Sequence, residues 1–495
     1  TIIKIALLKV SIVDIYKKQH SKGKLHAYER IEMLVDEDSF LEIGNDIKNT
    51  NKGISIEEKI PYDGVITGFG CISGNKVFIY AQDFAVMGGT LGENHGKKIV
   101  NLMKLALKEE KPIIGILDSG GARIQEGAFA LSQYGKVFNY NVKASGKIPQ
   151  ISIIVGPCAG GAVYSPALTD FVFIVDNIGK MFLTGAEVTN KALGTNYDKS
   201  TYGNSEYVSK RSGVAHFRYC NEEQCYINVK KLIIFLSNKK FENNLPFRTW
   251  NFNLPSSSRR VYDMKLLIEQ IVDRNSFIEV KKEFALNAIT GFALIKGIRI
   301  GMVANQPYAK AGILDCDASD KIAEFVRFCD SFSIPIITLV DVPGFMPGEA
   351  EEAKGIIRHG AKIVYAYSES SVLKITIVIR KAYGGAYIAM GSKSLGTDYV
   401  FAWENAEIAV MGAKEAVSIL YKKELNSLND IEREKYYKDK AIEYQKLLVD
   451  IDNAAKWGLV DAVIKPEQTN KYIFRCLSQR ENETSEMFKH ALNPL

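Results

Sequence analysis

The sequence is poor in cysteine and lacks any long apolar run. Seven cysteines occur among 495 residues, an odd number, and no two are spaced as Cys-x-x-Cys. A disulfide scaffold or a zinc ribbon needs paired cysteines, so we expect buried thiols in a reducing compartment instead. No stretch of about 18 apolar residues occurs, which excludes a transmembrane helix. The histidines show no His-x-x-x-His spacing, and no metal site is predicted.

An excess of charge of one sign is also lacking. The chain has 63 basic and 57 acidic residues, a formal net charge of +6. Nucleic-acid binding usually needs a dense basic stripe, and none is present, so no nucleic-acid partner is expected. The mild basic excess suits anionic small molecules. With 46% apolar and 24% charged residues, the composition excludes disorder, collagen and coiled coil as descriptions of the whole chain.

The first residues do not have the pattern of a signal peptide. Residues 2–10 are apolar but contain two lysines, and no small-residue cleavage site follows. This segment therefore predicts an amphipathic helix. The predicted location is the cytoplasm, or the mitochondrial matrix in a eukaryote.

The sequence repeats itself at a nearly constant offset in residue number, which predicts two homologous domains. We place them at residues 1–250 and 251–495, with a polar boundary segment at 243–260 that contains two prolines and three consecutive serines. The matching segments are Gly68-Phe69 with Gly291-Phe292, Lys98-Ile99 with Lys321-Ile322, residues 112–118 with 335–341, and Gly160-Gly161-Ala162 with Gly384-Gly385-Ala386.

Short β-branched runs alternate with helical patterns in each half. Residues 151–155 and 375–379 are bounded by turn residues and predict buried strands. Residues 426–445 are charged and predict a solvated outer helix. This alternation is typical of an α/β architecture.

A glycine pair followed by a helical pattern comes soon after each of those two strands. The first N–H groups of a helix have no partner within it, and glycine lets a ligand approach the backbone closely. Such a turn can hold a developing oxyanion. One turn alone is explained by tight packing, but two at matched positions favour a function. Residues 118–123 form a further glycine-rich loop, which could supply another donor or lie against phosphates or a thioester, although it is not a P-loop.

Residues 156–160 allow a different interpretation. The pattern Gly-x-Cys-x-Gly resembles a nucleophile elbow with Cys158 as nucleophile. A hydrolase of this kind would need a histidine, and the candidates are His216, His359 and His490. The second half keeps the glycines but has no nucleophile. We therefore favour Cys158 as a small buried residue and keep the Cys158-dependent hydrolase as an alternative.

The chain contains six longer motifs, at residues 118–127, 156–167, 341–345, 355–360, 380–387 and 406–413. These motifs resemble signatures of the biotin-dependent acyl-CoA carboxyltransferase family. The similarity runs from about Lys22 to His490 and is strongest to the propionyl-CoA carboxylase β and methylmalonyl-CoA decarboxylase α branches, with transcarboxylases nearly as similar.

The resemblance implies two tandem crotonase-like (ClpP/crotonase) α/β domains, a hexamer, and an active site between the N-terminal domain of one chain and the C-terminal domain of its dimer partner. It implies that the N-terminal domain takes the acyl-CoA and the C-terminal domain the carboxybiotin. The implied residues are Gly160 and Gly161 for the thioester oxygen, Gly385 and Ala386 for the ureido oxygen of biotin, Gly120, Gly121, Ala122 and Arg123 for CoA, and Gly344, Phe345, Gly384 and Ile388 for the biotin and acyl pocket.

The implied reaction moves CO2 from carboxybiotin to the α-carbon of an acyl-CoA, chiefly propionyl-CoA to methylmalonyl-CoA, without a side-chain base. A decarboxylase or transcarboxylase direction is the alternative. The chain has no Ala-Met-Lys-Met biotinylation site and no ATP-binding glycine loop. Biotin should therefore arrive on a separate carrier protein, with a biotin carboxylase as a further partner.

Two departures from the family pattern leave details open. Ile388 stands where many propionyl-specific members have Asp, which leaves the acyl preference open. Residues 202–205 read Tyr-Gly-Asn-Ser where the family usually has Leu-Gly-Gly-Ala, which leaves a non-catalytic scaffold as a further alternative.

Overall fold

The computed structural model describes residues 17, 19–21, 23–49, 61–237, 241, 246–255, 257 and 260–479. The chain divides into two compact units, which contain the described residues 17–237 and 241–479. The helix predicted at residues 2–10, and His490, lie outside the described residues. The second unit begins before the predicted boundary at residue 250, because Phe241 N–H donates to Gly297 O at 2.9 Å and Phe252 is part of the second core.

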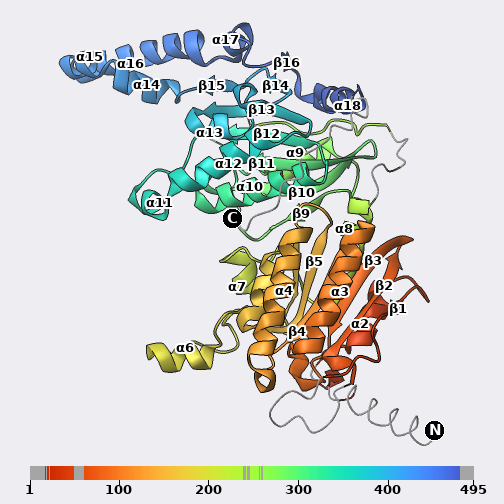
Figure 1. The fold of residues 1–495 in the computed structure, drawn as a ribbon. Coiled ribbons are helices and arrows are strands. Elements are labelled where there is room, and N and C mark those ends of the chain that lie inside the picture. Colours follow the sequence, from red (N-terminus) through yellow and green to blue (C-terminus); the bar gives the residue numbers. More distant parts are fainter. Residues whose placement is uncertain are drawn as a thin grey trace, which may run out of the picture. The chain divides into compact units, whose positions relative to one another are not determined.

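The first unit contains an eight-stranded sheet (Figure 1). The order is β1-β2-β3-β4-β5-β6-β8, with β7 beside β5. The first three strands are antiparallel, and the sheet is parallel from β3 onward. The strands are β1 (Leu41–Glu42), β2 (Val65–Ile72), β3 (Asn75–Gln82), β4 (Ile113–Ser119), β5 (Gln150–Ala159), β6 (Phe171–Val175), β7 (Lys180–Phe182) and β8 (Phe217–Tyr219).

Helices α3 and α4 run side by side along this sheet (Figure 1). Ile99, Leu102, Met103 and Ala106 are buried, and this spacing gives α3 one apolar stripe that faces the core. The helices are α2 (Ala27–Leu34), α3 (Glu93–Glu109), α4 (Ala128–Ala144), α5 (Tyr164–Ala167), α6 (Ala186–Leu193), α7 (Ser205–Lys210) and α8 (Glu222–Ser237).

The second unit has a sheet of the same strand order, β9-β10-β11-β12-β13-β14-β16, with β15 beside β13. The strands are β9 (Ile278–Val280), β10 (Ala288–Ile295), β11 (Ile298–Asn305), β12 (Ile336–Val342), β13 (Lys374–Tyr383), β14 (Tyr399–Trp403), β15 (Glu407–Ala409) and β16 (Ala462–Ile464). The helices are α9 (Met264–Ile271), α10 (Cys316–Ser331), α11 (Glu349–Lys354), α12 (Ile356–Glu369), α13 (Gly384–Ala389), α14 (Ala413–Leu420), α15 (Lys422–Ser427), α16 (Asp430–Tyr444), α17 (Ile451–Lys456) and α18 (Thr469–Gln479).

The internal repeat predicted from the sequence is confirmed strand by strand. Strands β2, β3 and β4 have the same lengths as β10, β11 and β12, and one constant offset in residue number separates each pair. Strands β5 and β13 also have equal lengths, and their offset is larger by a single position. The two sheets have the same neighbours. Positions in one unit can therefore be matched directly with positions in the other.

The two units differ in the segment that follows α6 in the first unit and α14 in the second. In the first unit, residues 194–204 connect α6 to α7, whereas residues 421–450 of the second unit connect α14 to α17. The helix predicted at 426–445 is two helices, α15 and α16, because Asn429 caps a new helix by accepting from Glu432 N–H at 3.0 Å. Helix α16 contacts α14, so it is not simply a solvated outer helix.

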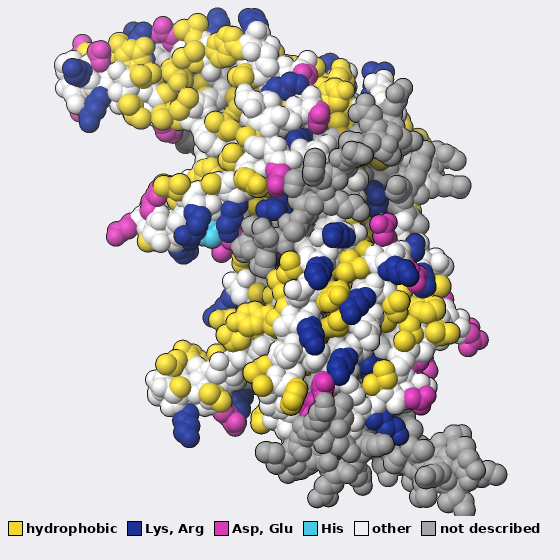
Figure 2. All heavy atoms as spheres, in the orientation of Figure 1, with side chains coloured by type: hydrophobic (Ala, Val, Ile, Leu, Met, Phe, Trp, Pro, Cys, Tyr) yellow, Lys and Arg dark blue, Asp and Glu magenta, His cyan; other side chains and the backbone are white. Residues whose placement is uncertain are grey.

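Basic side chains gather on the surface over α3 and α4 (Figure 2). The exposed lysines of these helices include Lys104, Lys108, Lys136 and Lys143, so part of the basic excess is concentrated there. Within the described part of the chain, no helix combines the length and apolar character needed to cross a membrane.

Candidate active site

The predicted site residues lie in loops at the carboxyl ends of the parallel strands, where α/β proteins bind their ligands. In the first unit, the loops after β4 and β5 are neighbours, because Ser119 pairs with Cys158. Gly121 has φ +106, and a Cβ there would lie 2.8 Å from Ala159 O. Only glycine permits this close approach of the two loops.

Internal hydrogen bonds occupy the backbone donors of the first loop. Gly120 N–H donates to Gly88 O at 2.9 Å, and Gly121 N–H donates to the Ser119 hydroxyl at 3.1 Å. The predicted oxyanion donor in this loop is therefore not supported at either glycine. Ala122 is half-buried and bridges to Leu91.

Arg123 anchors this loop from inside the protein. Its side chain is fully buried, and its guanidinium donates to Asp63, to Glu126 at 2.7 Å and to Thr90 O at 2.9 Å. The resemblance placed Arg123 near CoA, but a guanidinium held in this way does not reach a ligand at the surface. The residue instead fixes the loop through these buried contacts. Removal of one partner of a buried ion pair strongly destabilises the folded protein.

Asp118 stabilises the end of β4 through a buried cluster of charges. Its carboxylate accepts from Lys24 at 2.7 Å and from Arg30 at 3.0 Å, and Arg30 also donates to Glu222 at 2.8 Å. Burial raises the pKa of Asp118, and the Arg30 and Lys24 cations oppose this shift. Gly156 makes room for the cluster, since a Cβ there would meet the Asp118 carboxylate.

The first glycine turn leaves its backbone open to solvent. A 3₁₀ turn over Gly160–Val163 follows β5 directly and leads into α5. Gly160 has φ +65, Gly161 is exposed, and a Cβ on either would meet nothing within 4 Å. The parallel pairing of Ala159 with Phe182 engages the Gly160 N–H in the sheet. Among the described residues, no backbone acceptor outside the helices and strands takes a hydrogen bond from the Gly161 N–H, as expected at a helix start.

The second glycine turn has the same form. Helix α13 begins at Gly384, which has φ +59, and Gly385 is exposed while Ala386 is fully buried. The ring of Phe345 lies 3.9 Å from a Cβ built on Gly385. The parallel pairing of Tyr383 with Ala409 engages the Gly384 N–H in the sheet, and no described backbone acceptor outside the helices and strands takes a hydrogen bond from the Gly385 N–H. The two turns are therefore structurally matched.

The two predicted donor pairs are staggered by one position. At the offset of β5 and β13, Gly160 corresponds to Gly384 and Gly161 to Gly385. The predicted pairs, Gly160 with Gly161 and Gly385 with Ala386, are thus not equivalent positions. Gly161 and Gly385 are equivalent positions, and each is a member of the donor pair predicted for its own turn.

The loop after β12 corresponds to the loop after β4. Gly344 O accepts from Leu314 N–H at 3.1 Å, as Gly121 O accepts from Leu91 N–H at 2.9 Å. Asp341 is again buried and ion-paired, here with Arg380 at 3.0 Å. Arg380 occupies the position of Gly156, so each unit neutralises its buried aspartate with a cation from a different element.

Ile388 and Tyr164 are matched positions beside the two turns. Ile388 is 47% exposed and Tyr164 is 49% exposed. Sequence reasoning singled out Ile388 but missed Tyr164. The offset between the two glycine pairs, which was already visible in the sequence, identifies it.

Cys158 has none of the features of a nucleophile. It is 1% exposed within β5, and burial raises the pKa of its thiol to about 12. His216 is buried and accepts from Val172 N–H at 3.1 Å, and His359 lies beside Asp320 in the second unit. The structure therefore does not support the Cys158-dependent hydrolase.

The loop that departs from the family pattern is well packed. Gly203 has φ +64, and a Cβ there would meet Met181 O. Asn204 caps α7 by accepting from Tyr207 N–H at 2.9 Å, and Ser205 bonds to Asp176. The described residues contain no group of three His, Cys, Asp or Glu placed to hold a metal ion.

The chain has two tandem α/β units with matched glycine turns. Comparison with known sequences and structures identifies the class of protein that has this arrangement. The family model "Carboxyl transferase domain" matches residues 18–492. The methylmalonyl-CoA decarboxylase subunit alpha of Veillonella parvula is 46% identical over 494 residues, covering 97% of this chain and 95% of that protein. The propionyl-CoA carboxylase beta chain of Saccharopolyspora erythraea is 45% identical over 483 residues, covering 93% and 88%.

A solved structure agrees with these relatives. The transcarboxylase 12S crystal structure, described as a hexamer with methylmalonyl-coenzyme A bound, has a TM-score of 0.90 and 42% identity, covering 99% of this chain and 98% of that one. The chain therefore belongs to the carboxyl transferase domain family and is an enzyme of the biotin-dependent carboxyltransferase type. The predicted fold class, two tandem crotonase-like units, is confirmed.

Proposed function

We propose that this chain is the carboxyltransferase subunit that moves CO2 from carboxybiotin, held on a separate carrier protein, to the α-carbon of propionyl-CoA. The observation that carries the proposal is the pair of matched glycine turns after β5 and β13. The propionyl-CoA carboxylase relative and the methylmalonyl-CoA bound in the transcarboxylase 12S structure support the substrate.

The first turn stabilises negative charge on the thioester oxygen of the acyl-CoA. Abstraction of the α-proton places an enolate charge on this oxygen, and the open N–H of Gly161 with that of a neighbouring residue can donate to it. Donors fixed before the reaction need no reorganisation during it. The exposed Gly161 leaves room for the thioester, because no described side chain covers the turn.

The second turn fits the bicyclic ring of biotin. Gly385 has an open N–H for the ureido oxygen. The ring of Phe345 lies next to Gly385, and the exposed Ile388 follows on the same helix, so both offer apolar surface near it. When bound, carboxybiotin supplies the CO2 and a ureido nitrogen that takes the α-proton. The role of the chain at this turn is to hold the ring and to stabilise charge on the ureido oxygen through N–H groups at Gly385 and a neighbouring residue.

The carboxylates beside the turns are already neutralised. Asp118 is paired with Lys24 and Arg30, and Asp341 with Arg380. A general base must be within hydrogen-bond reach of the proton and free to accept it. Neither buried aspartate meets that condition, which supports chemistry without a side-chain base.

Proline and alanine at the same position test the two turns. Gly161→Pro removes the N–H, and Gly161→Ala keeps it in open space. Loss of one oxyanion donor lowers kcat by about 10²–10³, so the proline variant should lose that factor and the alanine variant should stay within about threefold. The same difference between the proline and alanine variants is expected at the second turn, for Gly385→Pro and Gly385→Ala. Equal rates for proline and alanine variants of the same fold would refute the proposal.

The direction of transfer and the partners follow from the same proposal. The decarboxylase and carboxylase relatives are 46% and 45% identical to the chain, and the transcarboxylase is 42% identical. Because these values are close, we propose that the partner proteins, and not the chain itself, determine the direction of transfer. A biotin carrier, a biotin carboxylase and a hexamer are the partners we propose, in the cytoplasm or mitochondrial matrix. The absence of metal from the chemistry, and the acyl preference set near Ile388, stay predictions.

A further inference from the structure

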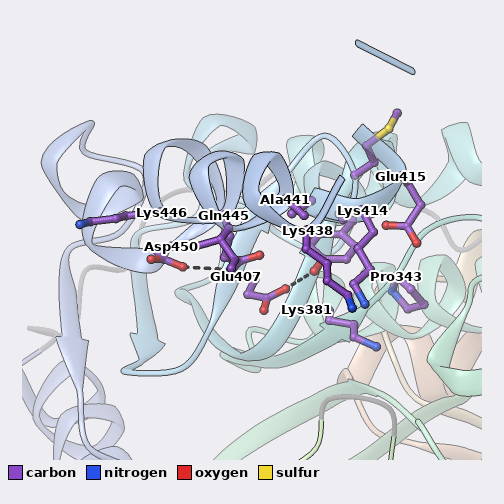
Figure 3. A pocket seen from close by; sticks show the side chains of 15 residues that line it. Pro343, Lys381, Glu407, Lys414, Glu415, Lys438, Ala441, Gln445, Lys446 and Asp450 are labelled. Atoms are coloured by element: carbon purple, nitrogen blue, oxygen red, sulfur yellow. Dashed lines mark hydrogen bonds between the residues drawn. The ribbon is translucent and has the colours of Figure 1, made fainter. Parts of the chain in front are cut away.

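A groove of about 1000 Å³ lies in the second unit between α14, α16 and the end of β13 (Figure 3). Residues from four segments far apart in the sequence line it, and it does not include either proposed donor pair. Its lining residues are Pro343, Lys381, Tyr383, Glu407, Met411, Gly412, Ala413, Lys414, Glu415, Lys438, Ala441, Ile442, Gln445, Lys446 and Asp450.

Helix α16 forms one wall of the groove and is firmly attached. Tyr437 Oη donates to Lys414 O at 3.0 Å, which joins α16 to α14, and Arg433 Nε donates to Leu425 O at 2.7 Å. The corresponding connection of the first unit is short and contains no helix. The groove therefore exists only because the second unit carries the longer segment.

Two of the three carboxylates in the groove have partners within it. Glu407 accepts a hydrogen bond from the Tyr383 hydroxyl, and Asp450 accepts from Gln445 Nε2 at 3.0 Å. The third, Glu415, lies over Gly412. Figure 3 shows Glu415 at the same end of the groove as the three lysines described next, whereas Glu407 and Asp450 lie farther along it.

Three ammonium groups converge at one end of the groove. Figure 3 shows the ends of Lys381, Lys414 and Lys438 gathered beside Pro343, while Lys446 points away. Lys438 bonds to Glu434 at 2.6 Å, whereas neither Lys381 nor Lys414 forms an ion pair with any residue the structure describes. Like charges brought together repel, so this end of the groove attracts an anion.

The fold itself does not require these lysines. In the first unit, Pro157 occupies the position of Lys381 and Glu187 that of Lys414, although β5 matches β13 and α6 matches α14. The third lysine comes from the segment that the first unit lacks. The cluster is therefore specific to the second unit.

We infer that this groove binds the phosphate groups of a nucleotide. Three ammonium groups match a ligand with several negative charges better than a single carboxylate, and the apolar Met411 and the exposed Ile442 offer a surface for a base. Two sources share this chemistry, a separate nucleotide and the adenosine 3′,5′-bisphosphate end of an acyl-CoA.

Calorimetric titration of the full chain with adenosine 3′,5′-bisphosphate tests the inference. The double variant Lys381→Gln, Lys414→Gln should bind at least about tenfold more weakly than wild type. Lys435→Gln, an exposed lysine of α16 that does not line the groove, should bind like wild type. Unchanged affinity in the double variant, or no binding by wild type, overturns the inference.

Enzyme kinetics then distinguish a separate nucleotide from the nucleotide end of an acyl-CoA. This second experiment rests on the proposed function. The KM of methylmalonyl-CoA is compared with that of its pantetheine thioester, which lacks the nucleotide. A higher KM for the CoA thioester alone in the double variant assigns the groove to the substrate. Unchanged KM values, with weakened nucleotide binding, assign it to a separate nucleotide. No turnover by wild type would refute the proposed function and leave the calorimetric result standing.

Discussion

Burial decides what single polar side chains do in this chain. Asp118, Arg123 and Cys158 all lie in motifs that suggest contact with substrate, yet each is buried. The first two are held in ion pairs, and the third is a thiol whose pKa burial raises to about 12. We therefore propose that the chemistry of the site depends on backbone N–H groups rather than on these side chains.

Alkylation separates Cys158 from Cys220. At pH 8 a thiol with a pKa of about 12 is ionised to about one part in 10⁴. Because Cys220 is exposed, iodoacetamide should modify it in the native protein and leave Cys158 intact, as mass spectrometry can show. Cys158→Ala should retain carboxyl transfer. A folded Cys158→Ala protein without transfer activity would contradict the structural role assigned to this residue.

Arg123→Lys distinguishes an anchoring role from a CoA contact. Lysine keeps the charge but cannot donate to Asp63, Glu126 and Thr90 O together. We expect a loss of about 2 kcal/mol or more in unfolding free energy, measured as a lower melting temperature, with an unchanged KM for acyl-CoA. A tenfold higher KM at an unchanged melting temperature would instead favour a direct CoA contact.

At the scale of elements, matched lysines hold the turns that precede equivalent strands. Lys98 Nζ donates to Tyr62 O at 3.0 Å before β2. Lys321, its counterpart on α10, donates to Phe284 O at 2.8 Å and to Ala288 O at 2.7 Å before β10. Both lysines are buried, and each fixes a helix to the entry of a strand.

Lys321 should make stability depend on pH. Burial lowers its pKa from 10.5 to about 7. Between these values the unfolded chain binds the proton and the folded chain does not, so stability rises with pH, by about 1.4 kcal/mol per unit at most. The melting temperature of wild type relative to Lys321→Met should therefore increase from pH 6.5 to pH 9. The exposed control Lys435→Met should follow wild type, and a constant difference between wild type and Lys321→Met would contradict the shift.

Strands and turns of this chain were predictable to different degrees. The constant offset between halves identified β4 with β12 and β5 with β13, because buried β-branched runs give strong signals. It could not show that the N–H groups of Gly120 and Gly121 are used internally, since their partners, Gly88 O and Ser119 Oγ, come together only in the folded loop. The burial of Arg123 was missed for the same reason, because Asp63 lies far away in the sequence.

At the scale of the whole molecule, the internal duplication explains why two matched glycine turns occur in one chain. In the proposed carboxyl transfer, negative charge develops on two oxygens, one on each substrate, and we propose that each unit contributes one turn to stabilise one of them. The units then diverged, as shown by the buried aspartates, which take their cations from different elements, and by α16. The charged pattern of residues 426–445 predicted a solvent-exposed helix but not that α16 lines a groove. Charge in a sequence indicates which residues are exposed, but it does not show which part of the fold the other face of the helix contacts.

Carboxyl transfer from methylmalonyl-CoA to free biotin by the purified chain tests the central claim most directly. The account predicts that propionyl-CoA forms only when biotin is present, and that Gly161→Pro slows the transfer by about 10²–10³ while Gly161→Ala and Cys158→Ala keep it. Transfer should be faster from methylmalonyl-CoA than from malonyl-CoA. Release of free CoA that does not depend on biotin and is lost in Cys158→Ala, or no transfer by the folded chain, would contradict it.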